Sequence, residues 1–207
     1  MSKSSNSFVF SFIPKSESQK QAIKCFNEND LSIFLGPAGS GKSFTALSLA
    51  LQEVHLGRKK KVIFTRPLVE AGEKLGYLPG ELDEKIAPYA QVMEYLKHQI
   101  VYKLPEGILE FVPLAYMRGM TYTDTVMILS ESQNCRYTQL RMFCTRAGKN
   151  SKIILEGDEE QSDLPTNGDE LLDFTEALEG NNGIGVIDFQ GNVDFRSPIV
   201  RTVLRYT

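Results

Sequence analysis

Cysteine and histidine are scarce in this sequence, which has only three cysteines and two histidines among its 207 residues. Cys25, Cys135 and Cys144 are odd in number and lack metal-ligand spacing, so we expect free thiols in a reducing cytoplasm. His55 and His98 are isolated, with no cysteine or acid at ligand spacing. The pattern argues against a disulfide framework and against a metal site built on histidine or cysteine.

Long apolar runs and a strong excess of charge are also missing. No segment approaches the ~18 apolar residues that a membrane-spanning helix needs, and residues 1–7 lack the apolar core of a signal peptide. The formal net charge of −3 argues against a uniformly basic surface, although a local basic patch remains compatible with it. We therefore expect a cytoplasmic protein with no membrane partner.

Length and composition fit one globular α/β domain, with 42% apolar and 24% charged residues. We expect residues 14–207 to form this domain and residues 1–13 to form an N-terminal tail. The aromatic residues Phe8, Phe10 and Phe12 leave two interpretations open. They form a strand or a clasp onto a neighbour, or they belong to a frayed tail.

Apolar segments of strand length alternate with segments of helical spacing along the domain. The expected strands cover residues 31–35, 62–65, 109–112, 125–129, 152–155 and 184–189. The expected helices cover residues 16–27, 44–56, 81–87, 89–102, 137–148 and 169–178, with a last one from residue 197. Pro88 is expected to separate two of these helices. The alternation predicts a mostly parallel sheet with helices on both faces.

The most informative segment is Gly-Pro-Ala-Gly-Ser-Gly-Lys-Ser at residues 36–43. An apolar strand precedes it and a helical pattern follows, which is the context of a Walker A phosphate loop. Its glycines allow successive N–H groups to point inward at phosphate oxygens, while Lys42 reaches the phosphates and Ser43 ligates Mg²⁺. The predicted nucleotide contacts in this segment are Gly36, Pro37, Ala38, Gly39, Ser40, Gly41, Lys42, Ser43 and Phe44. The fold class is therefore a single P-loop NTPase (RecA-like) domain.

Such an ATPase also needs acids at the end of a neighbouring strand. Glu131 follows the strand at 125–129 and stands where an acid orients the attacking water, but the metal-side position is Ser130. Farther on, Asp158 and Gln161 form a G-D-x-x-Q pattern after another apolar strand. The amide of Gln161 can donate to phosphate and accept from water, which suits a γ-phosphate sensor. The candidate metal-side residues are Ser43, Ser130 and Asp158.

Together these motifs resemble those of PhoH-like proteins over nearly the whole chain from about Pro14. The segments that carry the resemblance are residues 36–43, 65–67 with 70–80, 113–119, 131–134 and 157–161. The resemblance implies an ATP-binding domain similar to the first motor domain of superfamily 1 helicases. It also implies a role in RNA metabolism and ring-like oligomers, a hexamer being one candidate. The short form resembles a bacteriophage-encoded member, which implies a host cytoplasm.

The resemblance further implies roles for residues outside these loops. Gln19 is the best match to a glutamine that reads adenine, with an exposed helical glutamine as the alternative. Arg66 and Lys74 follow the second strand, which faces single-stranded RNA in a helicase-like arrangement. The alternative for Arg66 is a salt bridge to a nearby glutamate at position 70 or 73.

Two features decide how the site is expected to work. The family normally shows aspartate at position 130, so Ser130 puts hydrolysis in doubt while leaving ATP binding intact. A helicase-type motor receives a charge-stabilising arginine from a second domain. The 207 residues of this sequence leave no room for such a second domain. An arginine supplied by a neighbouring subunit is the expected substitute, and Arg146 and Arg196 are the candidates.

Three functions follow in order of preference. The first is a Mg²⁺/ATP-dependent oligomeric ATPase acting on RNA, in an RNA-stimulated or helicase-like manner. The second is a nucleotide-gated assembly module with little or no hydrolysis, because of Ser130. A small-molecule kinase is third, since no arginine-rich lid is found and G-D-x-x-Q is not a kinase feature.

Overall fold

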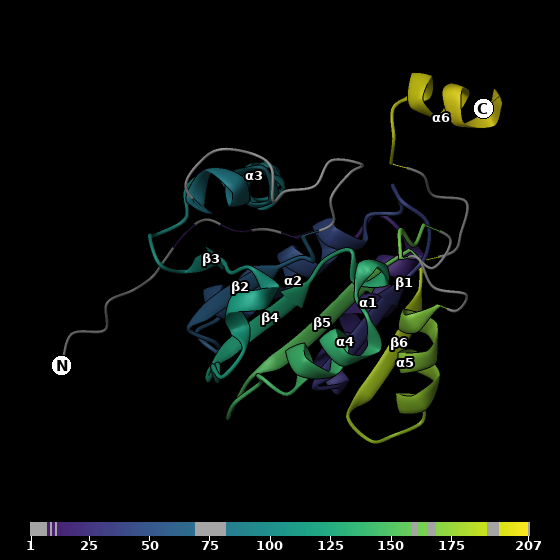
Figure 1. Ribbon diagram of the computed structural model, residues 1–207. Helices are drawn as coiled ribbons and strands as arrows, with labels where there is room; N and C mark the ends of the chain where they lie inside the picture. Colours follow the sequence, from purple (N-terminus) through teal and green to yellow (C-terminus); the bar gives the residue numbers. More distant parts are fainter. Residues whose placement is uncertain are drawn as a thin grey trace.

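In the computed structural model, six parallel strands form one sheet in the order β3-β2-β4-β5-β1-β6 (Figure 1). The structure describes residues 8, 10, 12–68, 82–158, 161–164, 169–189 and 195–206. The strands are β1 (Leu31–Leu35), β2 (Lys61–Thr65), β3 (Leu109–Phe111), β4 (Thr125–Leu129), β5 (Lys152–Gly157) and β6 (Ile184–Asp188). Neighbouring strands in this order pair in parallel, as the alternating sequence pattern predicts.

Helices cover both faces of the sheet. They are α1 (Glu17–Glu28), α2 (Lys42–His55), α3 (Leu82–Ile100), α4 (Tyr137–Cys144), α5 (Glu170–Leu178) and α6 (Pro198–Tyr206), with short 3₁₀ helices at Leu114–Met117 and Ser132–Asn134. Figure 1 shows α4 and α5 on one face and α2 on the other, while α6 projects away from the body. None of the helices in the described ranges combines the length and the apolarity needed to cross a bilayer.

The strand β4 shows how the sheet separates two hydrophobic cores. Val126 and Ile128 pack on the face covered by α1, α2 and α3, whereas Met127 and Leu129 pack on the face covered by α4 and α5. Successive side chains of a strand point to opposite faces. Both faces are covered here, so the strand is a continuous apolar run rather than an alternating one.

Most expected elements are confirmed, and two helices need correction. Ser16 caps α1, since its Oγ accepts a hydrogen bond from the Gln19 backbone N–H at 3.2 Å. The expected break at Pro88 is wrong, because α3 runs through it without interruption. Met93, together with partly buried apolar residues of the same helix, packs into the core, and this tertiary packing outweighs the local effect of proline. The helix expected to reach residue 148 ends at Cys144, because the following residues pair with Tyr122.

The N-terminal aromatic residues pack against α2 of their own domain. The Phe8 ring is only 6% exposed and its centroid lies 5.3 Å from that of the His55 imidazole. Phe10 lies 6.0 Å from the same imidazole, and Phe12 lies 6.1 Å from Phe44. The packed rings extend the core of the domain toward the N-terminus, into the segment that the sequence assigns to a tail.

We predict that Phe8→Ala lowers the free energy of unfolding by about 3 kcal/mol, because it removes a buried ring and leaves a cavity. Urea denaturation followed by circular dichroism measures the change. Ile13→Ala is the matched control, since Ile13 is 74% exposed and its loss should change stability little. Equal unfolding midpoints for the two variants would contradict the packing of Phe8.

Candidate nucleotide-binding site

The loop between β1 and α2 borders a cavity of about 320 Å³ at the carboxyl-terminal edge of the sheet. Gly39 and Gly41 have φ angles of 85° and 88°, a region that glycine occupies without a side-chain clash. Gly41 is also the N-cap of α2, so the first N–H groups of that helix face the loop. The positive end of a helix dipole and inward-facing amides together favour an anion at this position.

Two polar groups of the loop are suited to contact an anionic oxygen. The Ala38 N–H donates to Asp158 Oδ2 at 2.8 Å, so a carboxylate oxygen already occupies one donor. The Ser40 Oγ is buried and has no hydrogen-bond partner within the described part of the chain. Buried polar groups are rarely left unmatched, and such a group in a phosphate loop fits a phosphate oxygen.

Lys42 lies in the same cavity and is 7% exposed. Its Nζ donates to the carbonyl oxygens of Gly36 at 2.5 Å and Pro37 at 2.9 Å. Neutral carbonyls are weaker partners for an ammonium group than an ionised phosphate, because only the phosphate carries an opposite charge. The lysine is thus held beside the position that a phosphate would take.

The hydroxyl of Ser43 points at a carboxylate that the sequence analysis did not select. Ser43 Oγ donates to Glu156 Oε1 at 2.8 Å, and Glu156 is 2% exposed. Burial and then the charge of Glu131 raise the pKa of Glu156 above its ordinary value, whereas Lys42 and hydrogen bonds from Ser130 and Ser43 lower it. Asp158 instead faces the Ala38 amide. The expectation that Ser130 leaves the metal side without an acid stays a prediction, and Glu156 is a buried carboxylate next to that position.

In the described residues, no three histidine, cysteine, aspartate or glutamate side chains gather into a metal-binding group. A magnesium ion at Ser43 would therefore rely on phosphate oxygens and water for most of its ligands. Mg²⁺ is usually bound in this way, through one or two protein oxygens and the phosphates of a substrate. The hydroxyl of Ser43 and the adjacent carboxylate of Glu156 fit that requirement.

Glu131 stands at the end of β4 with a strained backbone. Its φ of 56° is unusual for a residue with a side chain. The carboxylate accepts a hydrogen bond from Gln133 Nε2 at 2.7 Å and lies 3.9 Å from Arg66 Nη2. Gln161 borders the same cavity, and its N–H donates to the carbonyl oxygen of Asp158 at 3.1 Å. Strain of this kind is concentrated at functional sites, which supports a role for Glu131.

A second cavity of about 290 Å³ adjoins the first, and Gln19, Gly41 and Phe44 border it. Gln19 is 3% exposed, so the alternative of an exposed helical glutamine is wrong. Its Oε1 accepts a hydrogen bond from the Lys15 backbone N–H at 2.7 Å. Phe195 borders both cavities, and its N–H donates to the Gly39 carbonyl oxygen at 3.1 Å. Sequence reasoning missed Phe195, since an isolated aromatic residue carries no motif.

The two candidate arginines lie at opposite ends of the domain. Arg196 lies on its own phosphate loop, where its Nη2 donates to the carbonyl oxygen of Ala38. Arg146 donates to the carbonyl oxygens of Met142 and Met120 near the start of β4. Of these two arginines, Arg196 is the one that borders the cavity of its own chain. A contribution of either arginine to a neighbouring subunit stays a prediction.

Arg66 lies at the end of β2, near the site, and Lys74 lies outside the described residues. The Arg66 guanidinium is 5.9 Å from the centroid of the Tyr89 ring. Its Nε is buried without a hydrogen-bond partner in the described ranges. The expected alternative partners, at positions 70 and 73, also lie outside the description, and the ion pair that the structure shows is with Glu131.

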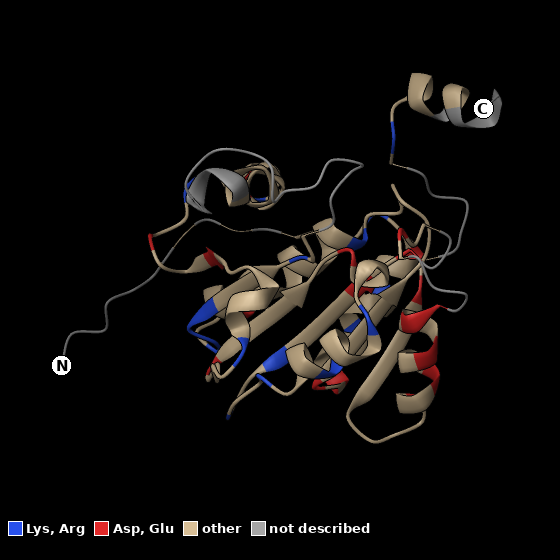
Figure 2. Ribbon diagram, viewed as in Figure 1, with Lys and Arg blue, Asp and Glu red and all other residues tan. Residues whose placement is uncertain are grey.

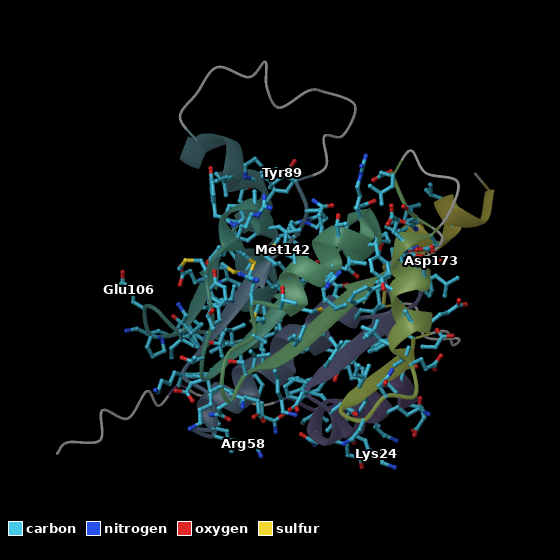
Figure 3. The ribbon with its side chains drawn as sticks, turned by 60° about the horizontal axis from the view of Figure 1, so that its bottom comes forward. Lys24, Arg58, Tyr89, Glu106, Met142 and Asp173 are labelled. Carbon is cyan, nitrogen blue, oxygen red and sulfur yellow. The ribbon has the colours of Figure 1, made fainter. Side chains whose placement is uncertain are left out.

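Other basic residues gather away from this edge. Figure 2 shows lysine and arginine where β2 and β5 begin, and acidic residues along α5. Arg58 pairs with Glu53 at 2.7 Å and Lys60 pairs with Asp124 at 2.6 Å. Figure 3 places Arg58 at the end of the molecule opposite Tyr89. These cations are therefore engaged with acids at the far edge of the sheet.

Comparison with known proteins agrees with this geometry. The family described as PhoH-like protein matches residues 11–207. The PhoH-like protein of Bacillus subtilis (strain 168) is 40% identical over 197 residues, which cover 92% of this chain and 62% of that protein. Protein PhoH of Escherichia coli (strain K12) is 33% identical over 207 residues, which cover 93% of this chain and 57% of that protein. The chain thus spans about three fifths of the length of these relatives.

Among solved structures, the Pyrococcus furiosus Hef helicase domain is similar, with a TM-score of 0.50 at 14% identity. The likeness covers 86% of this chain and 38% of that chain. At this identity it shows a shared fold, which is the α/β fold of P-loop NTPases.

Proposed function

We propose, because this chain belongs to the PhoH-like protein family, that it is a Mg²⁺-dependent ATPase that acts on RNA as an oligomer. The observation that carries the proposal is the single cavity bordered by Lys42, Ser43, Glu131 and Gln161. In this proposal, these residues supply a phosphate-binding loop, a hydroxyl for the metal, an acid for water and an amide for the γ-phosphate. ATP hydrolysis needs this set of groups.

Each residue has a distinct task in the proposed reaction. Lys42 exchanges its carbonyl partners for phosphate oxygens and stabilises the charge that develops on them. Glu131 orients the attacking water and accepts its proton, while Gln161 contacts both the γ-phosphate and that water. Ser43 would hold Mg²⁺ on the protein side, and the ion would supply positive charge to the phosphates. The second cavity takes the base, with Gln19 beside it.

RNA binding is proposed at the end of β2. Arg66 connects this surface to the catalytic acid, because it lies 3.9 Å from Glu131 and has a buried Nε without a partner in the described ranges. A nucleic-acid phosphate near Arg66 would change the field at Glu131. This connection supports ATP hydrolysis that responds to RNA.

A homo-oligomer is proposed because α6 carries apolar side chains that the domain does not cover. Ile199 is 67% exposed and Val200 is 41% exposed on a helix that projects from the body (Figure 1). Contiguous exposed apolar residues are typical of interfaces. Because Arg196 precedes this helix and lies on the phosphate loop, assembly through α6 would also affect the site.

We predict that Lys42→Ala weakens ATP binding by about 10- to 100-fold, since it removes charge-assisted contacts to phosphate. Isothermal titration calorimetry measures the dissociation constant. Lys24→Ala removes the same charge from an exposed position at the lower end of Figure 3 and should leave the constant unchanged. ATP binding by Lys42→Ala as tight as that of the parent would refute the proposed site.

For RNA, Arg66→Ala should weaken binding of a single-stranded oligonucleotide and reduce the salt dependence of log Kd by about one unit. Fluorescence anisotropy at several salt concentrations measures both. Arg58→Ala, at the opposite end of the molecule (Figure 3), is the control for loss of one arginine. Equal affinities of the parent and Arg66→Ala would show that RNA does not bind there.

Ile199→Asp should dissociate the oligomer into monomers, because it places a charge in an apolar interface. Light scattering coupled to size-exclusion chromatography gives the mass. Tyr102 is 99% exposed on another surface, so Tyr102→Asp should keep the parent mass. A parent that is monomeric at every concentration yet fully active would contradict the oligomeric proposal.

A further inference from the structure

The parallel register places positions 130 and 156 side by side. Leu129 of β4 pairs with Leu155 of β5, so Ser130 and Glu156 are the next residues of two adjacent strands. On its other side β5 pairs with β1, where Phe34 is opposite Glu156. Glu156 therefore stands on the strand directly beside the phosphate-loop strand, and Ser130 stands one strand farther away.

The partners of Glu156 leave its negative charge only partly compensated. Ser43 donates to it at 2.8 Å, and Ser130 is a second hydroxyl partner. A hydroxyl brings no full positive charge. The nearby Lys42 directs its Nζ at the carbonyl oxygens of Gly36 and Pro37. A buried carboxylate in such surroundings is costly unless a cation joins it.

The other acids at this edge are engaged elsewhere. Asp158 accepts from the Ala38 amide on the opposite part of the loop. Glu131 accepts from Gln133 and lies beside Arg66. Of the three acids in the described part of the chain that border the cavity, Glu156 is the one hydrogen-bonded to the hydroxyl of Ser43.

The geometry points to Glu156 as the metal-side carboxylate of this protein, a positioning residue that acts through Ser43 and takes over from the acid that position 130 lacks. By accepting the hydrogen bond from Ser43 Oγ, it would leave an oxygen lone pair of Ser43 for Mg²⁺, and its carboxylate would add negative charge to the metal site. Carboxylates that orient the ligands of a metal commonly contribute in this way. This inference rests on the proposed function of the site.

The small, neutral side chain of Ser130 is then the counterpart of Glu156. Two carboxylates on adjacent strands in a buried site would repel each other, and one would be driven to its protonated form. Compared with position 130, the carboxylate of Glu156 stands one strand nearer the phosphate loop. Ser130→Asp alone should therefore impair the site rather than improve it.

Four chains test the assignment: the parent, Glu156→Gln, Ser130→Asp, and the double variant Ser130→Asp/Glu156→Ser. Calorimetry gives the dissociation constant of ADP in the presence of Mg²⁺ and in the presence of EDTA. The ratio of the two constants measures how much Mg²⁺ increases the affinity for ADP. We expect the Mg²⁺-dependent gain in affinity to fall roughly 10- to 100-fold in Glu156→Gln. ADP affinity in EDTA should be retained or increased, because a negative charge near the phosphates is gone. The double variant should recover most of the gain.

Glu110→Gln is the matched control, since Glu110 is an exposed acid on β3 and should keep the parent ratio. A purely structural role of Glu156 would lower affinity in Mg²⁺ and EDTA alike, which would overturn the assignment. A ratio in Glu156→Gln equal to that of the parent would also overturn it. So would a double variant that binds ADP normally in EDTA but gains as little from Mg²⁺ as Glu156→Gln does. A parent that binds ADP in neither condition would instead refute the proposed function, and this inference with it.

Discussion

The hydrogen bond from Ser43 Oγ to the Glu156 carboxylate joins the start of α2 to the strand beside β1. It forms because β5 lies between β1 and β4 in a parallel sheet, so three strands end at the same edge. That edge then collects the phosphate loop, Glu131 and Asp158 from segments far apart in the chain. Ligand sites in open parallel sheets lie at this edge for the same reason. The proposed chemistry depends on this arrangement more than on any one motif.

Electrostatic balance explains the composition of the site. Lys42, Glu156 and Asp158 are all nearly buried, yet each has a polar partner that a nucleotide could replace or share. Carbonyl oxygens hold the lysine and the Ala38 amide holds Asp158, while two hydroxyls face Glu156. For the proposed binding of a nucleotide with Mg²⁺, such prearranged partners would lower the reorganisation needed on binding.

Much of the fold follows from local signals in the sequence. Continuous apolar runs located β1 and β4, and the spacing of residues 36–43 located the loop. Pro88 led to a wrong prediction of a helix break, because the packing of α3 on the core outweighs the local effect of the proline. Glu156 was missed because a single acid at the end of an apolar strand is usually exposed to solvent. Its position beside Ser43 follows from the order of the strands in the sheet, which local sequence signals do not give. Phe195 was missed likewise, because its contact with the loop spans most of the chain.

A crystal structure with ADP and Mn²⁺ in place of Mg²⁺ tests the central claim most directly, because anomalous scattering locates the metal independently of the refined protein. The account predicts phosphates enclosed by residues 36–43 and an anomalous peak next to Ser43 Oγ, on its Glu156 side. A peak held by Asp158 or Glu131 and distant from Ser43 would contradict the account, as would nucleotide density outside the loop.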